Sequence, residues 1–283
     1  MDQTLLVTGA TGTVGTSVVS SLLDYPVHIK AAFHQNPVAL AHPNISSVRF
    51  DLKDPSTYVD ALKNVTGLFL LPPASREGYA LAIQFIKSLV EVAPDLRHIV
   101  SISGMGTTPN DGSYYGEMEG LIQTTGIPYS LLRPNWFMQN FHTYFIDGIR
   151  YGELALPAGE AVTTFVDARD IGAVAAKILA EESFQWEALT LTGWDMLTYR
   201  EAVNMINKIT GLKITYRPIN DHAMRKGLEE AGWNQAGVEE MLELFGQVRN
   251  GLNATMTQDV TKVLGKAPRT FEKYVQDHKS LLI

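Results

Sequence analysis

The stretch TLLVTGATGTVG, residues 4–15, decides the fold of this chain. An apolar run at residues 4–8 is typical of a buried strand, and glycines follow it at every third position. Gly9 lets the chain turn sharply, Gly12 lets the backbone approach a pyrophosphate, and Gly15 lets a helix at residues 16–23 pack closely. We therefore predict a phosphate-binding turn that holds a nicotinamide dinucleotide, formed by Gly9, Ala10, Thr11, Gly12, Thr13, Val14 and Gly15.

The remainder of the first half repeats this order of strand and helix. Further strands are expected at residues 27–33, 47–50, 67–71, 98–102 and 128–132, and helices at residues 56–63, 79–92 and 114–125. Strands that read as continuous apolar runs and alternate with helices indicate a parallel sheet covered on both faces. The sequence therefore predicts an α/β protein with a doubly wound parallel sheet, the Rossmann fold.

The pattern changes after about residue 150, where the elements become shorter and mostly helical. Thr198 and Glu201 have the spacing of a capping box, which predicts a helix start there. The predicted domains are a dinucleotide-binding Rossmann domain at residues 1–150 and a smaller, mixed, mostly helical substrate lobe at residues 151–283. Some segments of this lobe are expected to return to the sheet.

Composition excludes several classes of function. The 283 residues carry a net charge of −7 without a cluster of basic residues, which argues against a nucleic-acid surface. The chain has no cysteine and no His-x-x-x-His spacing, so no metal site is expected. It shows no signal peptide and no apolar run of membrane-spanning length. We expect a soluble, cytoplasmic monomer or homodimer that binds a small-molecule substrate.

The residues at the end of the second expected strand bear on the choice of dinucleotide. An acidic residue there would favour NAD, and an arginine would favour NADP, but residues 33–37 read FHQNP. His34, Gln35 and Asn36 can donate hydrogen bonds to a 2′-phosphate without repelling it, which favours NADP(H) over NAD(H). Asp51 follows the third strand and is expected to accept a hydrogen bond from the adenine amino group, with Leu52 beside it.

More candidate residues follow the later strands, at the carboxyl edge where such sheets bind ligands. The predicted cofactor-binding residues at this edge are Leu71, Pro72, Pro73, Ser101, Ser103, Pro134 and Asn135. Aromatic side chains can form a flat apolar floor for a planar substrate, and we predict substrate contacts by Trp136 and Asn140. Arg133 is expected to form a buried structural pair.

Five stretches of the chain carry a family resemblance: TGATGTVG, HIVSISG, GIPYSLLRPNWFMQN, FVDARDIGAVAAKIL and GKAPRTFEKYV. Together they resemble the NmrA-like group of atypical short-chain dehydrogenases, over nearly the whole chain. The resemblance implies a Rossmann fold. It also implies one of two functions. Members of the group reduce quinones, triphenylmethane and azo dyes or imines with NAD(P)H, as festuclavine-dehydrogenase-like enzymes do, or they bind dinucleotides as regulators without catalysis.

The catalytic pair of typical short-chain dehydrogenases is incomplete here. In those enzymes a lysine four residues after a tyrosine lowers the pKa of the phenol, and a serine stands at the end of the preceding strand. Here Tyr115 stands at the place of that tyrosine and Ser103 at the place of that serine. The fourth residue after Tyr115 is Glu119 and not a lysine. An ionised glutamate opposes formation of a phenolate. Tyr115 and Ser103 therefore remain the catalytic candidates without the usual dyad.

Two interpretations follow from this departure. In the first, the protein is an NAD(P)H-dependent oxidoreductase that transfers hydride to a flat electrophilic molecule such as a quinone, an azo compound or an imine. In the second, Tyr115 and Glu119 form a structural pair, and the protein is a non-catalytic, redox-sensing regulator that binds NAD(P). We favour the first. A sugar-nucleotide epimerase, which shares the glycine turn, is disfavoured because its chemistry needs an activated tyrosine.

Overall fold

The structure is a computed structural model that describes residues 3–35 and 42–283. The chain forms two compact units, and each is built from several segments. Unit 1 comprises Met1–Pro134, Ala168–Leu191 and Asp259–Lys266, and unit 2 comprises Asn135–Asp167, Thr192–Gln258 and Ala267–Ile283. The chain first leaves unit 1 after Pro134, earlier than a boundary near residue 150, and two later segments return to it.

Unit 1 is built on a seven-stranded sheet in the order β3-β2-β1-β4-β5-β6-β9, and every neighbouring pair is parallel. Its strands are β1 (Gln3–Val7), β2 (Val27–Phe33), β3 (Ile45–Arg49), β4 (Gly67–Leu70), β5 (His98–Ile102), β6 (Tyr129–Pro134) and β9 (Glu187–Leu191). The strand order reverses between β1 and β4, as in a doubly wound sheet. The predicted fold class is confirmed, and β9 is a segment from the second half that returns to the sheet.

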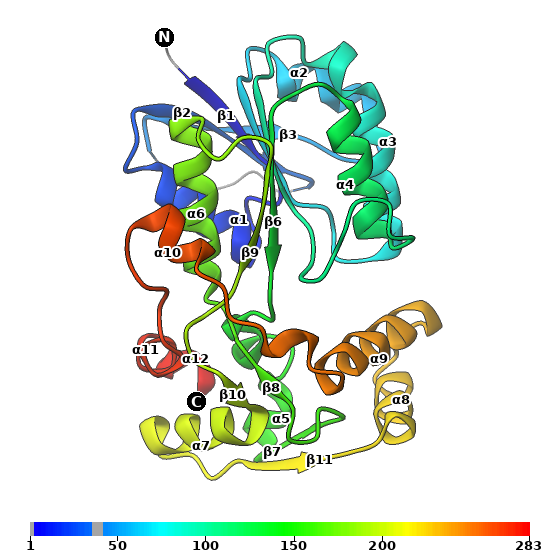
Figure 1. The fold of residues 1–283 in the computed structure, drawn as a ribbon, viewed down its shortest axis with the longest axis vertical. Helices are drawn as coiled ribbons and strands as arrows, with labels where there is room; N and C mark the ends of the chain where they lie inside the picture. The colour runs from blue at the N-terminus through cyan, green and yellow to red at the C-terminus, as the bar shows by residue number, and fades with distance from the viewer. Residues whose placement is uncertain (1–2, 36–41) are drawn as a thin grey trace. The chain divides into compact units, whose positions relative to one another are not determined.

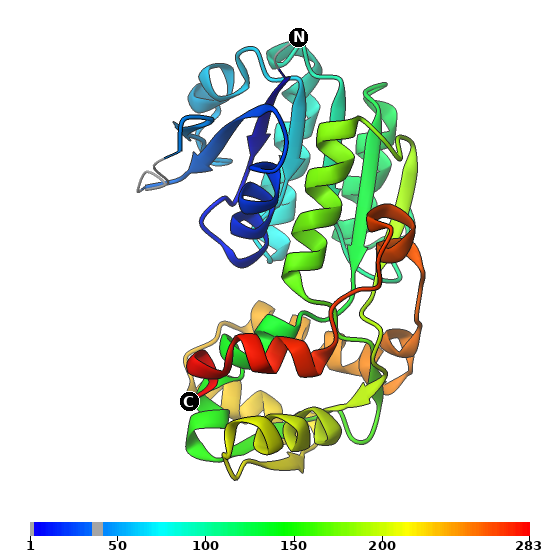
Figure 2. The ribbon, with the colours of Figure 1, turned by 90° about the vertical axis from the view of Figure 1, so that its left-hand side faces the viewer.

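Helices cover both faces of this sheet (Figures 1 and 2). On one face lie α1 (Thr13–Leu22) and α6 (Ala168–Glu181), and on the other lie α2 (Tyr58–Leu62), α3 (Arg76–Val92) and α4 (Tyr114–Thr124). The 3-10 helix η1 (Pro55–Thr57) precedes α2, and α10 (Asp259–Leu264) packs against α6 and β9. Because the two faces are covered, the strands read as continuous apolar runs in the sequence.

The first helix begins earlier than predicted. It starts at Thr13 directly after its N-cap Gly12, whose φ of −87° and ψ of 174° are extended, so the predicted start at residue 16 is wrong. The third glycine therefore lies inside the first turn of the helix. Helix α1 also packs closely against α6. A Cβ on Gly172 of α6 would meet Ser17 of α1 at 2.6 Å, so this glycine lets the two helices approach each other.

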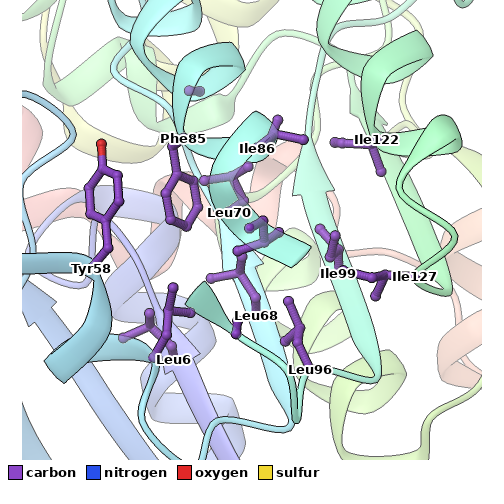
Figure 3. Close-up of a cluster of buried hydrophobic side chains, with 14 of the residues drawn as sticks. Leu6, Tyr58, Leu68, Leu70, Phe85, Ile86, Leu96, Ile99, Ile122 and Ile127 are labelled. Carbon is purple, nitrogen blue, oxygen red and sulfur yellow. The ribbon is translucent and has the colours of Figure 1, made fainter. Parts of the chain in front are cut away.

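The core of unit 1 between the sheet and the helices α2, α3 and α4 is a continuous cluster of apolar side chains (Figure 3). Leu68 and Leu70 of β4 are fully buried, and Phe85 of α3 packs edge-on against Tyr58 with ring centroids 4.9 Å apart. Full burial of one such large side chain stabilises a protein by about 2 kcal/mol. This packing holds the strand ends of unit 1 in a fixed arrangement.

Unit 2 has short elements and two small sheets. Its elements are η2 (Met138–His142), α5 (Ile146–Tyr151), β7 (Glu153–Leu156), β8 (Val162–Thr163), β10 (Leu197–Thr198), α7 (Tyr199–Thr210), β11 (Thr215–Pro218), α8 (Asp221–Glu230), α9 (Gln235–Arg249), η3 (Leu252–Ala254), α11 (Phe271–Asp277) and α12 (Lys279–Leu282). Strands β7 and β11 pair parallel, and β8 and β10 pair antiparallel. The predicted capping box of Thr198 and Glu201 is present at the start of α7.

Aromatic side chains form the core of unit 2. Tyr199 is fully buried and contacts Phe165 edge-on at 5.1 Å, and Phe141 contacts Phe271 in the same way at 5.0 Å. Such edge-to-face pairs add about 0.5–1.5 kcal/mol each to the burial of the rings. In the described part of the chain, we find no helix with the length and apolar character that crossing a lipid bilayer requires.

Candidate functional site

The glycine turn has the geometry that each of its glycines predicts. Gly9 has a φ of +62°, which an L side chain rarely adopts, and its carbonyl accepts a hydrogen bond from the amide of Gly12 at 2.9 Å. A Cβ on Gly15 would lie 2.0 Å from the Gly9 oxygen, so the helix cannot pack here with any other residue. Among the atoms of the described residues, a Cβ on Gly12 would meet only this same oxygen, at 3.4 Å. The space beside Gly12 is therefore open to a ligand.

The N-terminus of α1 provides the donors for that ligand. Its N-cap is a glycine, and no side chain in the described residues accepts a hydrogen bond from the first turn of this helix. The hydroxyl of Thr16 points back to the carbonyl of Ala10 at 3.1 Å, which closes the turn from within. Uncapped N–H groups and the positive end of the helix dipole favour phosphate groups. The residues present thus fit the pyrophosphate of a dinucleotide.

Leu71, which follows β4, lies against the glycine turn. A Cβ on Gly9 would meet its Cδ2 atom at 3.0 Å. Thr8 fixes this contact, because its hydroxyl donates to the carbonyl of Phe69 at 3.0 Å and accepts from the amide of Leu71 at 2.8 Å. The structure therefore brings Leu71 to the predicted phosphate site and adds Thr8, which the sequence did not single out. Pro72 is buried, and Pro73 is exposed.

The ends of β2 and β3 bring together two predicted cofactor residues. The Nε2 atom of His34 lies 2.9 Å from the Oδ2 atom of Asp51, although 17 residues separate them. The neighbouring Gln35 is exposed, and Leu52 is half-buried. Asn36, the third residue expected to face a 2′-phosphate, lies outside the described residues. The sequence predicted each residue of the pair but not their contact.

A buried ion pair lies near the ends of β5 and β6. The carboxylate of Glu119, which is fully buried, accepts hydrogen bonds from Arg133 Nε at 2.9 Å and from Arg133 Nη2 at 2.6 Å. The hydroxyl of Ser103 donates to the same carboxylate at 2.5 Å and accepts from the amide of Gly104 at 2.6 Å. The expected structural pair of Arg133 is confirmed. The nearby Ser101 is buried, and its hydroxyl donates to the carbonyl of Leu70 at 3.4 Å.

Tyr115 belongs to a group of three tyrosines. Its ring lies 4.6 Å from that of Tyr79 and 4.4 Å from that of Tyr114, measured between centroids. A Cβ on Gly104 would contact the ring at 3.5 Å, so Tyr115 lies beside the chain that follows Ser103. The charge of Glu119, one helical turn further, is matched by Arg133. The carboxylate that the sequence placed one helical turn from Tyr115 thus has its own cationic partner.

Asn135, the first residue of unit 2, is held on all sides. Its side-chain nitrogen donates to the hydroxyl of Thr164 at 2.7 Å and to the carbonyl of Asn253 at 2.9 Å. Its side-chain oxygen accepts from the amide of Trp136 at 2.8 Å and from the side chain of Asn253 at 2.7 Å. Pro134 is buried, and its carbonyl accepts from the amide of Met105 at 3.2 Å. Contacts of Pro134 and Asn135 with a cofactor stay predictions.

The two predicted substrate residues lie in unit 2 beside its aromatic core. Trp136 is half-buried, and its ring lies 5.0 Å from Phe245 of α9 and 6.3 Å from Phe145. Asn140 is also half-buried, and its backbone carbonyl accepts from the amide of Phe145 at 2.9 Å. Within the described residues, its side-chain amide has no hydrogen-bond partner. Both side chains present groups that a small molecule can use.

Relatives with named activities match nearly the whole length of the chain. It is 27% identical to an NAD(P)H azoreductase of Xenophilus azovorans and 26% identical to an agroclavine dehydrogenase of Claviceps purpurea. These matches cover 97% of this chain and 97% of the azoreductase, and 98% of this chain and 98% of the dehydrogenase.

A solved structure shares the fold. The NADPH-dependent quinone oxidoreductase QOR2 of Escherichia coli, complexed with NADPH, has a TM-score of 0.83 at 22% identity, over 97% of this chain and 98% of that one.

Two family models match the chain, and they overlap. A model described as NAD(P)H-binding spans residues 9–182, which include the glycine turn, the Glu119–Arg133 pair and β6. A second model, described as the NmrA-like family, spans residues 113–275, which include α4, the substrate candidates and most of unit 2. Because this second match covers more than half of the sequence, the chain belongs to the NmrA-like family.

Proposed function

We propose that this chain is an NAD(P)H-dependent reductase that transfers hydride to a flat, electrophilic small molecule such as a quinone, an azo compound or an imine. The observation that carries the proposal is the glycine turn, where Gly12 leaves room for a phosphate and the N-terminus of α1 has no side-chain cap. The azoreductase, the agroclavine dehydrogenase and the quinone oxidoreductase that resemble the chain support this choice of reaction.

The residues near Ser103 indicate what kind of acceptor suits the protein. When bound, the reduced nicotinamide supplies the hydride. The hydroxyl proton of Ser103 is directed to Glu119, whose charge is matched by Arg133, so this serine is not poised to donate to a substrate oxygen. A quinone, an azo compound or a conjugated imine accepts hydride with little acid catalysis by the protein, and water can then supply the proton. Tyr115, packed among tyrosines, has a ligand contact or a packing role in this proposal.

We assign the acceptor to Trp136 and Asn140 of unit 2. A half-buried indole offers a flat apolar surface for a planar ring, and a side-chain amide without a described partner can bind a heteroatom of the acceptor. For the cofactor we assign NADP(H) ahead of NAD(H), because neither an acidic residue nor an arginine follows β2. His34 and Gln35 are the described donors for a 2′-phosphate.

The proposal predicts oxidation of NADPH when a suitable acceptor is added. Loss of absorbance at the reduced-nicotinamide band is measured with panels of quinones, azo compounds and imines. In Gly12→Trp the indole fills the open phosphate position, and we expect at least a hundredfold loss of NADPH affinity, on the scale of a lost charge-assisted phosphate site. Gly227→Trp is the matched control, since no atom of the described chain lies within 4 Å of a Cβ at this position of α8, and this variant should bind NADPH normally.

A non-catalytic, NAD(P)-sensing regulator is the second candidate function, and the lack of a lysine after Tyr115 favours it. The same experiment separates the two. If NADPH binds tightly but no acceptor in the panels oxidises it, the proposal that the chain is a reductase is contradicted. A change in light scattering on addition of NADPH, which reports a change of assembly, then supports the regulator. Binding that is equal in the wild type and in Gly12→Trp contradicts both, because each depends on the glycine turn.

A further inference from the structure

In the contact between His34 and Asp51, the aspartate is held by the protein and the histidine is accessible to solvent. The side chain of Asp51 is 15% exposed and that of His34 is 60% exposed. One carboxylate oxygen of Asp51 accepts a hydrogen bond from the backbone amide of Lys53 at 2.9 Å. The backbone amide of Asp51 donates to the hydroxyl of Thr57 at 3.1 Å. The other oxygen faces Nε2 of His34 at 2.9 Å. No described residue bonds the Nδ1 atom of this imidazole.

The other charged groups near this pair have partners of their own. Besides Arg49, Lys53, Asp54, Tyr58 and Glu77, the neighbouring elements carry His28 and Lys30 on β2 and Asp60 on α2. His28 contacts Ser46, and the ammonium group of Lys30 donates to the backbone carbonyls of Asp60, Ala61 and Lys63. Arg49 lies 3.3 Å from Asp54, and Lys53 lies 2.8 Å from Glu77, whose hydrogen bond raises the pKa of the lysine. Residues 36–41, which read NPVALA, add no titratable side chain. The net charge at the pair therefore depends on the protonation of His34.

The two nicotinamide cofactors respond differently to that charge. A histidine side chain gains or loses its proton in the range between pH 5 and 8. With neutral His34, Asp51 leaves one unmatched negative charge, which repels the nearly two negative charges of a phosphate monoester. With protonated His34, the charge is matched, and the imidazolium can donate a charge-assisted hydrogen bond from Nδ1. The ribose hydroxyl of NADH carries no charge and is indifferent to the change.

We propose that His34 selects between NADPH and NADH by its protonation state, and that Asp51 is the positioning residue that holds its ring. The inference rests on the proposed function and adds a pH-dependent choice of cofactor to it. It gives Asp51 a different task from a contact with adenine, because both of its carboxylate oxygens have partners within the protein. Acidic conditions favour the phosphorylated cofactor, and alkaline conditions reduce that preference.

Equilibrium titrations with NADPH and with NADH test this at pH 5.5, 6.5, 7.5 and 8.5 and constant ionic strength. The quantity measured is the ratio of the two dissociation constants. For the wild type we expect the preference for NADPH to fall by about tenfold from the lowest to the highest pH, the scale of one charge-assisted hydrogen bond. His34→Gln keeps a donor but not the charge, so its preference at pH 5.5 should already be low. Its NADH affinity should not change.

Asp51→Asn should change the preference for NADPH at pH 8.5, and it should raise this preference where His34→Gln lowers it at pH 5.5. It removes the negative charge that repels the phosphate when His34 is neutral, so the preference for NADPH at pH 8.5 should rise severalfold above that of the wild type. If Asp51 had a purely structural role, Asp51→Asn would instead weaken the binding of both cofactors equally at every pH. His28→Gln is the matched control on β2, where His28 contacts Ser46 at 2.9 Å, and it should follow the wild-type profile.

The 2′-phosphate itself gains charge as the pH rises, but it does so with every variant. The difference between the wild type and His34→Gln therefore isolates the histidine. A ratio for the wild type that does not change with pH overturns the inference, and so does a His34→Gln profile equal to that of the wild type. In both cases the proposed function stands, because both nucleotides bind. Failure of both nucleotides to bind at any pH overturns the proposed function and the inference with it.

Discussion

Two carboxylates of unit 1 are each paired with a basic side chain, and the two pairs differ in their surroundings. Glu119 is fully buried and is bonded by both Nε and Nη2 of Arg133. Asp51 is paired with His34, a side chain that is 60% exposed and can lose its charge. A guanidinium remains charged at any pH at which proteins fold. The first pair is thus a permanent part of the structure, and the second can respond to its environment.

The two pairs differ because a buried charge must be matched permanently, whereas an exposed charge need not be. A buried carboxylate is tolerated only when its charge and its lone pairs are matched, and Glu119 achieves this with Arg133 and the hydroxyl of Ser103. A change of protonation there would leave the partner unmatched in the interior. At the ends of β2 and β3, water can replace either partner. A pair can therefore change its charge state there without disturbing the fold.

The largest effect is expected when the buried pair is broken on one side. Arg133→Met leaves Glu119 as an uncompensated charge in the interior, and we expect the free energy of unfolding to fall by about 3–5 kcal/mol. The measurement is equilibrium unfolding in urea at neutral pH. The double variant Arg133→Met/Glu119→Gln removes the charge and keeps an acceptor for Ser103, so it should recover more than half of the loss.

A surface pair that is also joined by two hydrogen bonds is the control for this prediction. Arg225 binds Glu239 through both Nη atoms, at 2.6 and 2.9 Å, but the two side chains are 36% and 53% exposed. Arg225→Met should leave the urea midpoint nearly unchanged, because water solvates the carboxylate that remains. Equal losses in Arg133→Met and Arg225→Met would show that burial does not distinguish the pairs.

A smaller effect is expected from a buried histidine of the same sheet. Burial lowers the pKa of His98 to about 4, with a partial opposing effect of Glu182. The folded protein thus binds fewer protons than the unfolded chain between pH 6.5 and 4, so stability is full above pH 6.5 and falls as the pH decreases. The loss attributable to His98 is about 3 kcal/mol below pH 4. Urea unfolding at a series of pH values measures it, and His98→Gln should flatten this part of the profile.

His28 is the matched control for His98. Both side chains contact a serine hydroxyl through Nε2 at 2.9 Å, Ser46 for His28 and Ser130 for His98, but His28 is only half-buried. His28→Gln should therefore leave the slope of stability against pH between 6.5 and 4 close to that of the wild type. A flattened slope in His28→Gln and an unchanged slope in His98→Gln would contradict the assignment to the buried ring.

The sequence predicted the backbone geometry of the glycine turn because everything that this geometry needs is local. Gly9, Gly12 and Gly15 lie within seven residues, and each meets a requirement of one turn, which the positive φ of Gly9 and the 2.0 Å approach at Gly15 confirm. The bounds of β2 and β5 were also predicted, since apolar runs between polar residues define them. The start of α1 was missed because an extended glycine N-cap leaves no side-chain signal in the sequence.

The pairs of the site were harder to predict because they depend on strand register. His34 and Asp51 meet only because β2 and β3 are parallel neighbours in which Phe33 lies opposite Arg49. The partner of Arg133 could not be predicted, since Glu119 lies on a helix and Arg133 on the strand that follows it. Asn135 and Asn253 are 118 residues apart, and no periodic pattern links them. Short elements in unit 2 add to this difficulty.

The smallest effect on stability is expected at the exposed pair of His34 and Asp51. His34→Gln should change the free energy of unfolding by less than about 1 kcal/mol, because the imidazole is largely solvated and the contact is screened by salt. The same variant should nevertheless change the ratio of NADPH to NADH affinity at pH 5.5. Urea unfolding and cofactor titration on one preparation measure both. A stability loss as large as that of Arg133→Met would mean that the pair holds the ends of β2 and β3 together, and that its charge serves the fold in the same way as the buried pair.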